Sequence, residues 1–497
     1  MKKFTITVIS LFMVLLISLS AISEAIGTNS KYASNQDYIQ SENLALKDKS
    51  NKMTDGKDGT VYRFKTRNGG ESVIDLGESC DFNSVILKEK GLNVQKFSIS
   101  VSDDNENFTQ IYANDKIEFH RLCTFDTVKA RYVKLTVEES DNLPKIREME
   151  IYNAVPEKKN DFRVSTYSTL GGSVFGIIDD TTLSDAEKDA KIKELIDADY
   201  YDTVTDYIDI GNVRWDEEGI IHTDGWDGIE RDEDKYYAVM MRNLHEVLDE
   251  KGVNLVITIL NPSGENGNQR VMKSITENRD TLITNMIAFA NKYEFDGIDL
   301  DWEFPLSQDE FDAYNSFLQE LKARMKTEMW NKEESTLSLA LATWALKYTP
   351  ETIECIDYVN VMGYDILDQD GQHFSFFSSC VQAADYIESQ GFSKEQINIG
   401  FPFYGTWEGG RMEQYAYNAI SEEISPFNNF YTMKKSDTKE DRYTYFNSQA
   451  IIRDKTAYAY LKGYGGVMIF SQYCDLPSDD ERSLTKAISD YLQEVTK

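Results

Sequence analysis

Three carboxylates with a spacing of two lie in one apolar stretch, FDGIDLDWEFP, at residues 295–305. Side chains of a β-strand alternate between its two faces, so Asp299, Asp301 and Glu303 share one face and apolar residues occupy the other. Carboxylates removed from water are unfavourable unless they are protonated, hydrogen-bonded or bound to a cation. Neighbouring negative charges raise one another's pKa, so such a row can hold a proton at neutral pH. The pattern therefore favours general acid chemistry.

Two other interpretations of the acidic row compete with this one. Carboxylate clusters bind hard cations such as Mg²⁺ or Ca²⁺, and most charge runs form a solvated face, although apolar neighbours make that a poor fit here. The four histidines are scattered and the five cysteines lack metal-ligand spacing, so we expect no catalytic metal and no other cofactor. Asp296 starts the strand with the opposite parity, which indicates a structural hydrogen-bonding role.

The acidic stretch is the fourth of eight strand-like segments that alternate with amphipathic helical segments across residues 162–497. This rhythm predicts an α/β fold, a TIM (β/α)8 barrel. A doubly wound open sheet is the alternative, but it would require a glycine-rich nucleotide turn after the first strand. Active sites of TIM barrels lie at the C-terminal ends of the strands. Asp299, Asp301 and Glu303 should then point into the barrel, with Glu303 at the top.

The segments before the barrel differ in character. Residues 36–154 contain short alternating runs separated by polar turns, which predicts an all-β sandwich domain. The polar stretch 155–161 predicts a linker. Residues 1–25 combine two lysines, an apolar run and a Ser-Glu-Ala site, and predict a signal peptide of a secreted, extracellular protein; a permanent membrane anchor is the less favoured alternative. No later run is long and apolar enough to predict a membrane span after signal cleavage.

The formal net charge of −33 argues against nucleic acid as a partner, because such a surface repels phosphates. Such a surface does not repel neutral sugars. We expect the protein to be a monomer. Cys80 and Cys123 lie in one predicted domain, where they form either a disulfide or two separate buried thiols.

The segment DGIDLDWE resembles the D-x-x-D-x-D-x-E motif of glycoside hydrolase family 18, the chitinase family, at every defined position. Residues 361–365 (VMGYD), 400–405 (GFPFYG) and 465–470 (GGVMIF) resemble the family's sixth, seventh and eighth strands. Parts of the front region, NLALKDKSNKMTDGKDG and residues 130–153, resemble discoidin-like domains of the coagulation factor 5/8 C-type. Such domains often bind carbohydrate, so this function is expected of residues 36–154; a spacer that binds no ligand is the alternative.

The family resemblance implies retaining, substrate-assisted hydrolysis of β-1,4 bonds next to N-acetylglucosamine, in chitin or chitooligosaccharides. Glu303 would protonate the glycosidic oxygen while the sugar's own 2-acetamido oxygen attacks the anomeric carbon. Asp301 would hold the acetamido N–H and offset the developing charge, and Asp299 would share a proton with Asp301. Tyr364 would donate to the acetamido oxygen, and Asp365 would contact the distorted sugar. Further sugar-binding positions implied by the resemblance are Met362, Tyr404, Tyr167, Phe470, Trp344 and Trp407; the two tryptophans have packing as an equal alternative.

Two departures from the family pattern leave the substrate open. The third strand ends in TILN, residues 258–261, where the family has S-x-G-G, and Phe470 stands where the family has tryptophan. N-linked glycans, cut by an endo-β-N-acetylglucosaminidase, and peptidoglycan are therefore rival substrates. A non-catalytic, chitinase-like lectin is the alternative outside the enzyme class. Inactive relatives typically lose the terminal acid, so the presence of Glu303 favours an enzyme.

Overall fold

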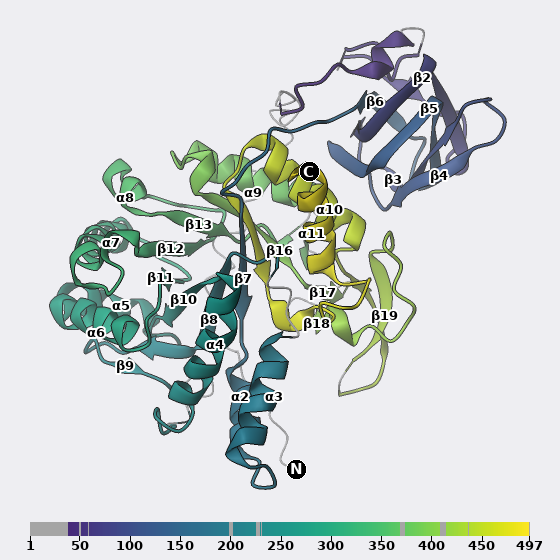
Figure 1. Ribbon diagram of the computed structural model, residues 1–497. Coiled ribbons are helices and arrows are strands. Elements are labelled where there is room, and N and C mark those ends of the chain that lie inside the picture. The colour runs from purple at the N-terminus through teal and green to yellow at the C-terminus, as the bar shows by residue number, and fades with distance from the viewer. Residues whose placement is uncertain are drawn as a thin grey trace.

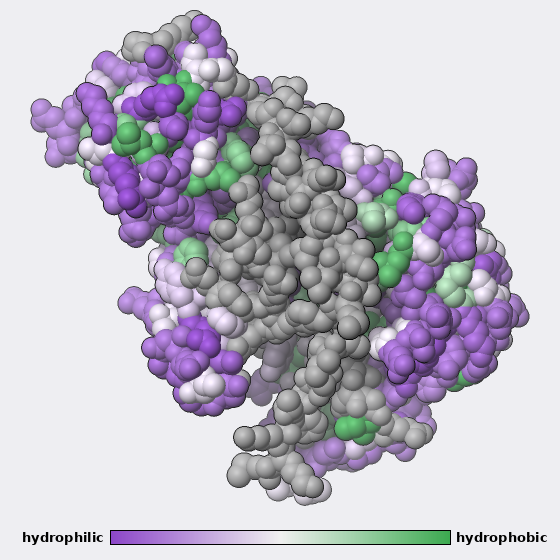
Figure 2. All heavy atoms as spheres, turned by 180° about the vertical axis from the view of Figure 1, so that it is seen from behind, coloured by the Kyte–Doolittle hydropathy of each residue, from purple (hydrophilic) through white to green (hydrophobic). Residues whose placement is uncertain are grey.

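The computed structural model describes residues 38–48, 51–57, 59–197, 202–224, 229, 231–367, 373–407, 414–435 and 437–496. The predicted signal peptide lies outside these ranges. Within them, no helix has the length and apolar character needed to cross a membrane. Figure 1 shows a β-rich N-terminal region beside a larger barrel. The side chains on the face shown in Figure 2 are mostly hydrophilic where the chain is described, in keeping with the high net charge.

The C-terminal part is a closed eight-stranded parallel barrel, as the sequence predicted. Its strands are hydrogen-bonded in the order β10-β11-β12-β13-β16-β21-β7-β8, and β8 pairs with β10 to close the barrel. The strands are β7 (Arg163–Ser168), β8 (Asp206–Trp215), β10 (Asn254–Leu260), β11 (Gly297–Leu300), β12 (Thr336–Leu341), β13 (Tyr358–Val361), β16 (Ile397–Pro402) and β21 (Gly466–Phe470).

Helices surround the barrel strands (Figure 1). One of them, α2, was not predicted from the sequence; its residues Val174, Phe175 and Ile178 bury an apolar face at helical spacing. Helix α7 begins at a capping box between Ser307 and Glu310. The helices are α2 (Gly171–Asp179), α3 (Asp185–Asp197), α4 (Tyr237–Lys251), α5 (Gly267–Thr276), α6 (Arg279–Lys292), α7 (Gln308–Glu328), α8 (Pro350–Cys355), α9 (Phe377–Ser389), α10 (Gln449–Lys462) and α11 (Leu484–Thr496).

Short strands extend the loops of the barrel. Between β16 and α10 the chain forms a small antiparallel sheet in the order β18-β17-β20-β19. Its strands are β17 (Tyr404–Trp407), β18 (Gln414–Ala416), β19 (Phe430–Lys434) and β20 (Asp441–Tyr445). The remaining short strands are β9 (Ile221–His222), which pairs with β8, and β14 (Ile366–Leu367), which pairs with β15 (His373–Phe374).

The N-terminal β domain, defined here as β1 to β6, is all-β as predicted. Its sheet has the antiparallel order β1-β6-β2-β5-β3-β4 and its own apolar core. The two longest strands pair with register shifts, where β-sheets bend. Cys80 and Cys123 are both free thiols, so of the two alternatives the disulfide is not formed. The strands are β1 (Tyr62–Arg63), β2 (Gly70–Glu89), β3 (Val94–Ser102), β4 (Thr109–Asn114), β5 (Arg121–Ser140) and β6 (Lys145–Tyr152).

The β domain packs directly on helix α10 of the barrel through a buried polar cluster. Asp454 of α10 accepts hydrogen bonds from Tyr112 Oη (2.5 Å), Thr124 N (2.7 Å) and Thr124 Oγ1 (2.8 Å). It also pairs with Arg121 at 3.1 Å, and both charged side chains are fully buried. Burial raises the pKa of Asp454 to about 6, although Arg121 and the hydrogen bonds oppose this. The two parts of the chain are therefore docked by specific contacts and not merely tethered by residues 155–161.

We expect Asp454→Ala to lower the free energy of unfolding by about 3–5 kcal/mol, because it leaves the Arg121 guanidinium buried without its partner. Urea denaturation checks this. The control is Asp490→Ala, which removes a partly exposed pair with Lys486 on α11 and should cost less than about 1 kcal/mol. Replacing both members of the buried pair, Arg121→Met with Asp454→Leu, should restore most of the loss. Equal stability of Asp454→Ala and the wild type would contradict this account of the interface.

Candidate active site

Asp299 on β11 lies inside the barrel, where hydroxyl groups from three other strands donate hydrogen bonds to it. Tyr167 on β7 donates to Oδ2 at 3.0 Å and Thr258 on β10 donates to the same oxygen at 2.8 Å. Ser338 on β12 donates to Oδ1 at 2.6 Å. Burial raises the pKa of Asp299, and the three hydroxyl bonds offset part of that effect. Because hydrogen bonds to a carboxylate favour its ionised form, Asp299 is the member of the row best suited to carry a negative charge.

Asp301 has a different environment from Asp299. Its Oδ1 atom is buried and has no hydrogen-bond partner among the described residues. Burial, followed by the negative charges of Glu303 and Asp299, raises the pKa of Asp301 well above its usual value. Asp301 is therefore the member of the row that most favours holding a proton, and it presents a buried acceptor that an incoming N–H group could satisfy.

Glu303 stands in a turn, and not in the strand that the sequence predicted. Strand β11 ends at Leu300, and residues further along the chain bond to helix α5. Asn268 of α5 accepts from Trp302 Nε1 at 3.2 Å and donates to the carbonyl oxygen of Phe304 at 3.0 Å. These two bonds hold the turn on both sides of Glu303.

The environment of Glu303 suits a general acid. Glu303 is exposed as a residue, yet the surrounding protein removes much of the hydration of its carboxyl group. This burial, followed by the negative charge of Asp365, raises the pKa of Glu303. A carboxyl group with a raised pKa keeps its proton closer to neutral pH, where it can be donated to a leaving oxygen.

Several of the predicted sugar-binding residues meet around Phe470 at the end of β21. The rings of Phe470 and Tyr364 are stacked, with centroids 6.0 Å apart and an interplanar angle of 19°. Tyr167 and Tyr404 approach the Phe470 ring edge-on, at 5.9 Å and 6.3 Å. Tyr404 also donates a hydrogen bond to Asp365 Oδ2 at 2.6 Å. The structure thus gathers residues from the first, sixth, seventh and eighth barrel strands, or from the segments that directly follow them.

The remaining predicted sugar-binding residues are less uniform. Trp344 is 38% exposed and makes an edge-to-face contact with the Phe304 ring at 4.7 Å, so it lies beside the turn that contains Glu303. Trp407 is covered by the Arg442 guanidinium at 4.4 Å from its ring centroid, which favours packing over an open sugar platform. Met362 is half-buried and follows the last residue of β13.

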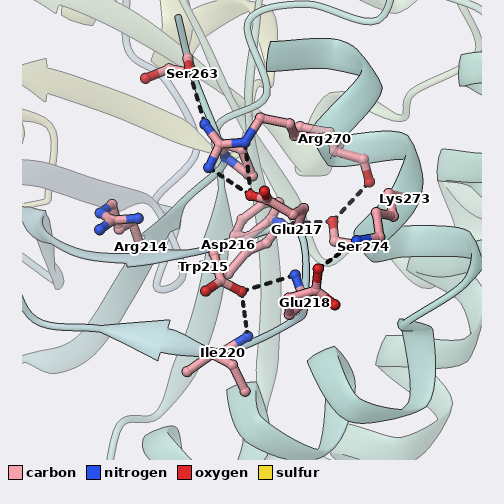
Figure 3. Close-up of polar contacts among 12 residues, drawn as sticks. Arg214, Trp215, Asp216, Glu217, Glu218, Ile220, Ser263, Arg270, Lys273 and Ser274 are labelled. Carbon is pink, nitrogen blue, oxygen red and sulfur yellow. Dashed lines mark hydrogen bonds and ion pairs between the residues drawn. The ribbon is translucent and has the colours of Figure 1, made fainter. Parts of the chain in front are cut away.

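A hairpin at the C-terminal end of β8 is fixed to the same helix that holds the Glu303 turn. Trp215 Nε1 donates to Ser274 of α5 at 2.9 Å. Figure 3 shows Arg270 of α5 reaching Glu217, to which it is paired at 2.7 Å. Asp216 closes the hairpin by accepting from the backbone of Glu218 and Ile220, both at 3.0 Å. Helix α5 therefore positions two loops, those that follow β8 and β11, at the C-terminal end of the barrel.

Sequence reasoning did not identify Thr258, Ser338 and Asn360 as site residues. Each faces the inside of the barrel, and Asn360 contacts Tyr167 at 3.2 Å. Polar residues at inward positions of apolar strands are the available signal, since a buried hydroxyl or amide requires a partner. Which partner it meets depends on the register between strands, and the sequence alone does not give that register.

Comparisons with known proteins show which families this chain resembles. Residues 232–475 match the family model for glycosyl hydrolases family 18, and residues 31–149 match that for the F5/8 type C domain. A "Probable endochitinase" of Caenorhabditis elegans is 27% identical over 159 residues, which cover 27% of this chain and 25% of the relative. A "Class V chitinase" of Arabidopsis thaliana is 26% identical over 196 residues, which cover 34% of this chain and 52% of the relative.

Among solved structures, a chitinase from Bacteroides thetaiotaomicron is similar with a TM-score of 0.48 and 20% identity. The alignment covers 67% of this chain and 97% of that one. Of the two curated relatives, the chain spans between 25% and 52% of their own length.

Proposed function

Because the barrel belongs to glycosyl hydrolases family 18, we propose that the protein hydrolyses β-1,4 bonds next to N-acetylglucosamine. The reaction would be retaining, and the nucleophile would be the 2-acetamido oxygen of the substrate. Glu303 would protonate the leaving oxygen, and Asp301 would accept the acetamido N–H and offset the positive charge of the oxazolinium ion. Tyr364 would donate its hydroxyl to the acetamido oxygen. Asp299 would remain ionised below Asp301.

The observation that carries this proposal is the buried Asp301 Oδ1, which has no partner among the described residues. A buried acceptor without a donor is unfavourable, and an acetamido N–H is a donor of suitable size and polarity. Asp301 stands two residues from the proposed acid on one side and two residues from the thrice hydrogen-bonded Asp299 on the other. This arrangement supports one proton donor and one charge stabiliser in the row.

The alternatives concern the sugar polymer and the existence of turnover. Chitin, N-linked glycans and peptidoglycan all contain N-acetylglucosamine next to a β-1,4 bond. The most direct experiment incubates the protein with chitin oligomers, a high-mannose glycoprotein and cell-wall peptidoglycan side by side, and identifies the products by mass spectrometry. Reducing-end products from one substrate identify the activity, whereas binding without products in all three supports the lectin alternative.

Substrate assistance makes a separate prediction. Oligosaccharides whose 2-acetamido groups have been replaced by free amines cannot supply the attacking oxygen, so we expect no measurable cleavage at those sugars. Matched acetylated and deacetylated oligomers of equal length provide the comparison, with release of reducing ends as the measurement. Efficient cleavage of the fully deacetylated oligomer would exclude this mechanism.

A further inference from the structure

A chain of hydrogen-bonded side chains crosses the barrel from its N-terminal end to Asp299. Arg163 Nε donates to Asn398 Oδ1 at 3.1 Å, and Asn398 Nδ2 donates to Asn360 Oδ1 at 3.2 Å. Asn360 Nδ2 then donates to the Tyr167 hydroxyl at 3.2 Å, and that hydroxyl donates to Asp299 Oδ2 at 3.0 Å. Both asparagines, Tyr167 and Asp299 are almost completely buried.

Arg163, the first residue of this hydrogen-bonded series, determines which atom donates and which accepts in every later bond. An asparagine amide can be turned so that its oxygen and nitrogen exchange places, but a guanidinium has only donors. Arg163 therefore requires the oxygen of Asn398, which turns the nitrogen of Asn398 towards Asn360. Asn360 must in turn accept on its oxygen and donate from its nitrogen. The Tyr167 oxygen is thereby occupied as an acceptor, and its hydrogen is directed to Asp299.

Two glycines leave space for Arg163 and Asn398, the first two residues of this hydrogen-bonded series. A Cβ atom on Gly465 would lie 2.2 Å from Arg163 Nη2 and 2.0 Å from the carbonyl oxygen of Glu395. A Cβ atom on Gly466 would lie 2.8 Å from Asn398 Oδ1. The same guanidinium also donates to the Glu395 carbonyl. The Gly-Gly pair at the start of β21 thus allows Arg163 to reach both of its acceptors.

We propose that Asn398 and Asn360 are positioning residues. Because Arg163 fixes the orientation of both amides, Asn360 donates to the Tyr167 oxygen, and the Tyr167 hydroxyl keeps donating its hydrogen bond to Asp299. This inference rests on the proposed function, because it assigns a role in the acidic row. Its consequence is that Asp299 stays ionised while the proton of the row stays on Asp301, next to the sugar site.

The other titratable groups around Asp299 do not determine its ionisation in this way. Among the described residues, the titratable groups that interact electrostatically with Asp299 are Asp301, just after β11, and the phenols of Tyr167 on β7, Tyr358 on β13 and Tyr314 on α7. Burial raises the pKa of all three phenols well above the ordinary value, so they stay neutral. The ionisation of Asp299 then depends on its hydroxyl donors and on Asp301.

The test reverses the donor and acceptor roles in this series of hydrogen bonds by a substitution at Asn398, which does not contact Asp299 directly. In Asn398→Asp, a carboxylate pairs with Arg163 and has no N–H to donate, so Asn360 must turn its amide and present its oxygen to Tyr167. The Tyr167 hydrogen then turns from Asp299 to Asn360, and Asp299 keeps two of its three donors. The carboxyl signal of Asp299, followed by ¹³C NMR and identified by its loss in Asp299→Asn, should titrate about one pH unit higher. The acid limb of kcat/KM should move upward with it.

A control variant distinguishes the effect of the reoriented amides from the effect of the negative charge added at position 398. In the double variant Asn398→Asp with Asn360→Leu, the added carboxylate remains. Leucine has no group that accepts the Tyr167 hydrogen, so Tyr167 donates to Asp299 again. We expect the Asp299 titration to return to within a few tenths of a pH unit of the wild type. As a second reversal, Asn360→Asp accepts directly from Tyr167 and should give the same upward shift as Asn398→Asp.

The outcomes are distinct. No shift in both reversing variants, with native circular dichroism, overturns the proposal, as does a shift that persists in the double variant. Because the NMR titration needs no substrate, it remains decisive if none of the tested glycans is cleaved. Failure of the proposed function and failure of this inference can therefore be told apart.

Discussion

Glu303→Gln should lower kcat by about 10²–10⁴-fold and leave sugar affinity nearly unchanged. Glutamine has almost the same shape as glutamic acid, but it cannot give a proton to the leaving oxygen. The turn that positions the side chain is held by Asn268 through Trp302 and Phe304, and none of these contacts involves the Glu303 carboxyl group. The measurements are the initial rate on a defined oligosaccharide and its binding by calorimetry.

The pH dependence offers an internal check on this substitution. The pKa of Glu303 is raised by burial and by Asp365. The acid must be protonated to act, so wild-type activity should fall as the pH rises through this raised pKa. In Glu303→Gln the residual activity should lack that alkaline limb. Glu320→Gln on α7, which removes a partly exposed pair with Arg279 of α6, is the matched control and should keep the wild-type profile. Turnover of Glu303→Gln within a few-fold of the wild type would remove Glu303 from the acid role.

The sequence predicted the barrel because each of its strands carries a local pattern. Alternation within the acidic stretch placed Asp299 on the inner face, and the contacts of Asp299 with three inward-facing hydroxyl groups agree with this. Alternation did not reveal where the strand ends. That point depends on Asn268, which is far from Trp302 in the sequence and becomes its neighbour only when α5 packs beside the turn.

Contacts between distant segments account for the other features that the sequence did not reveal. Arg121 and Asp454 are separated by 333 positions, and each looks like an ordinary surface charge in its own element. The polar chain from Arg163 to Asp299 takes residues from strands far apart in the sequence, and its direction follows from hydrogen-bond chemistry only once the register is known. Local patterns gave the elements and the acidic row, whereas the partners of the row required the closed barrel.

Asp301→Asn should lower kcat by about 10²–10³-fold with a much smaller effect on KM. Burial and the neighbouring charges of Glu303 and Asp299 raise the pKa of Asp301, so the free protein favours its neutral form. An asparagine resembles that neutral acid and can still accept the acetamido N–H with its oxygen. It cannot become negatively charged, so the loss should fall on the transition state, in which the oxazolinium charge develops.

Asp296→Asn, directly before β11, is the matched control for this substitution. The Asp296 carboxylate accepts from Leu255 N at 2.8 Å at the start of the strand, away from the row. We expect it to change stability more than rate. If Asp301→Asn instead weakened binding and left kcat intact, Asp301 would be a ground-state contact, and the stabilisation of an oxazolinium ion would have to come from another group. A loss confined to kcat, and absent on replacing Asp296, would assign the charge of the transition state to the buried carboxyl group whose Oδ1 has no partner among the described residues.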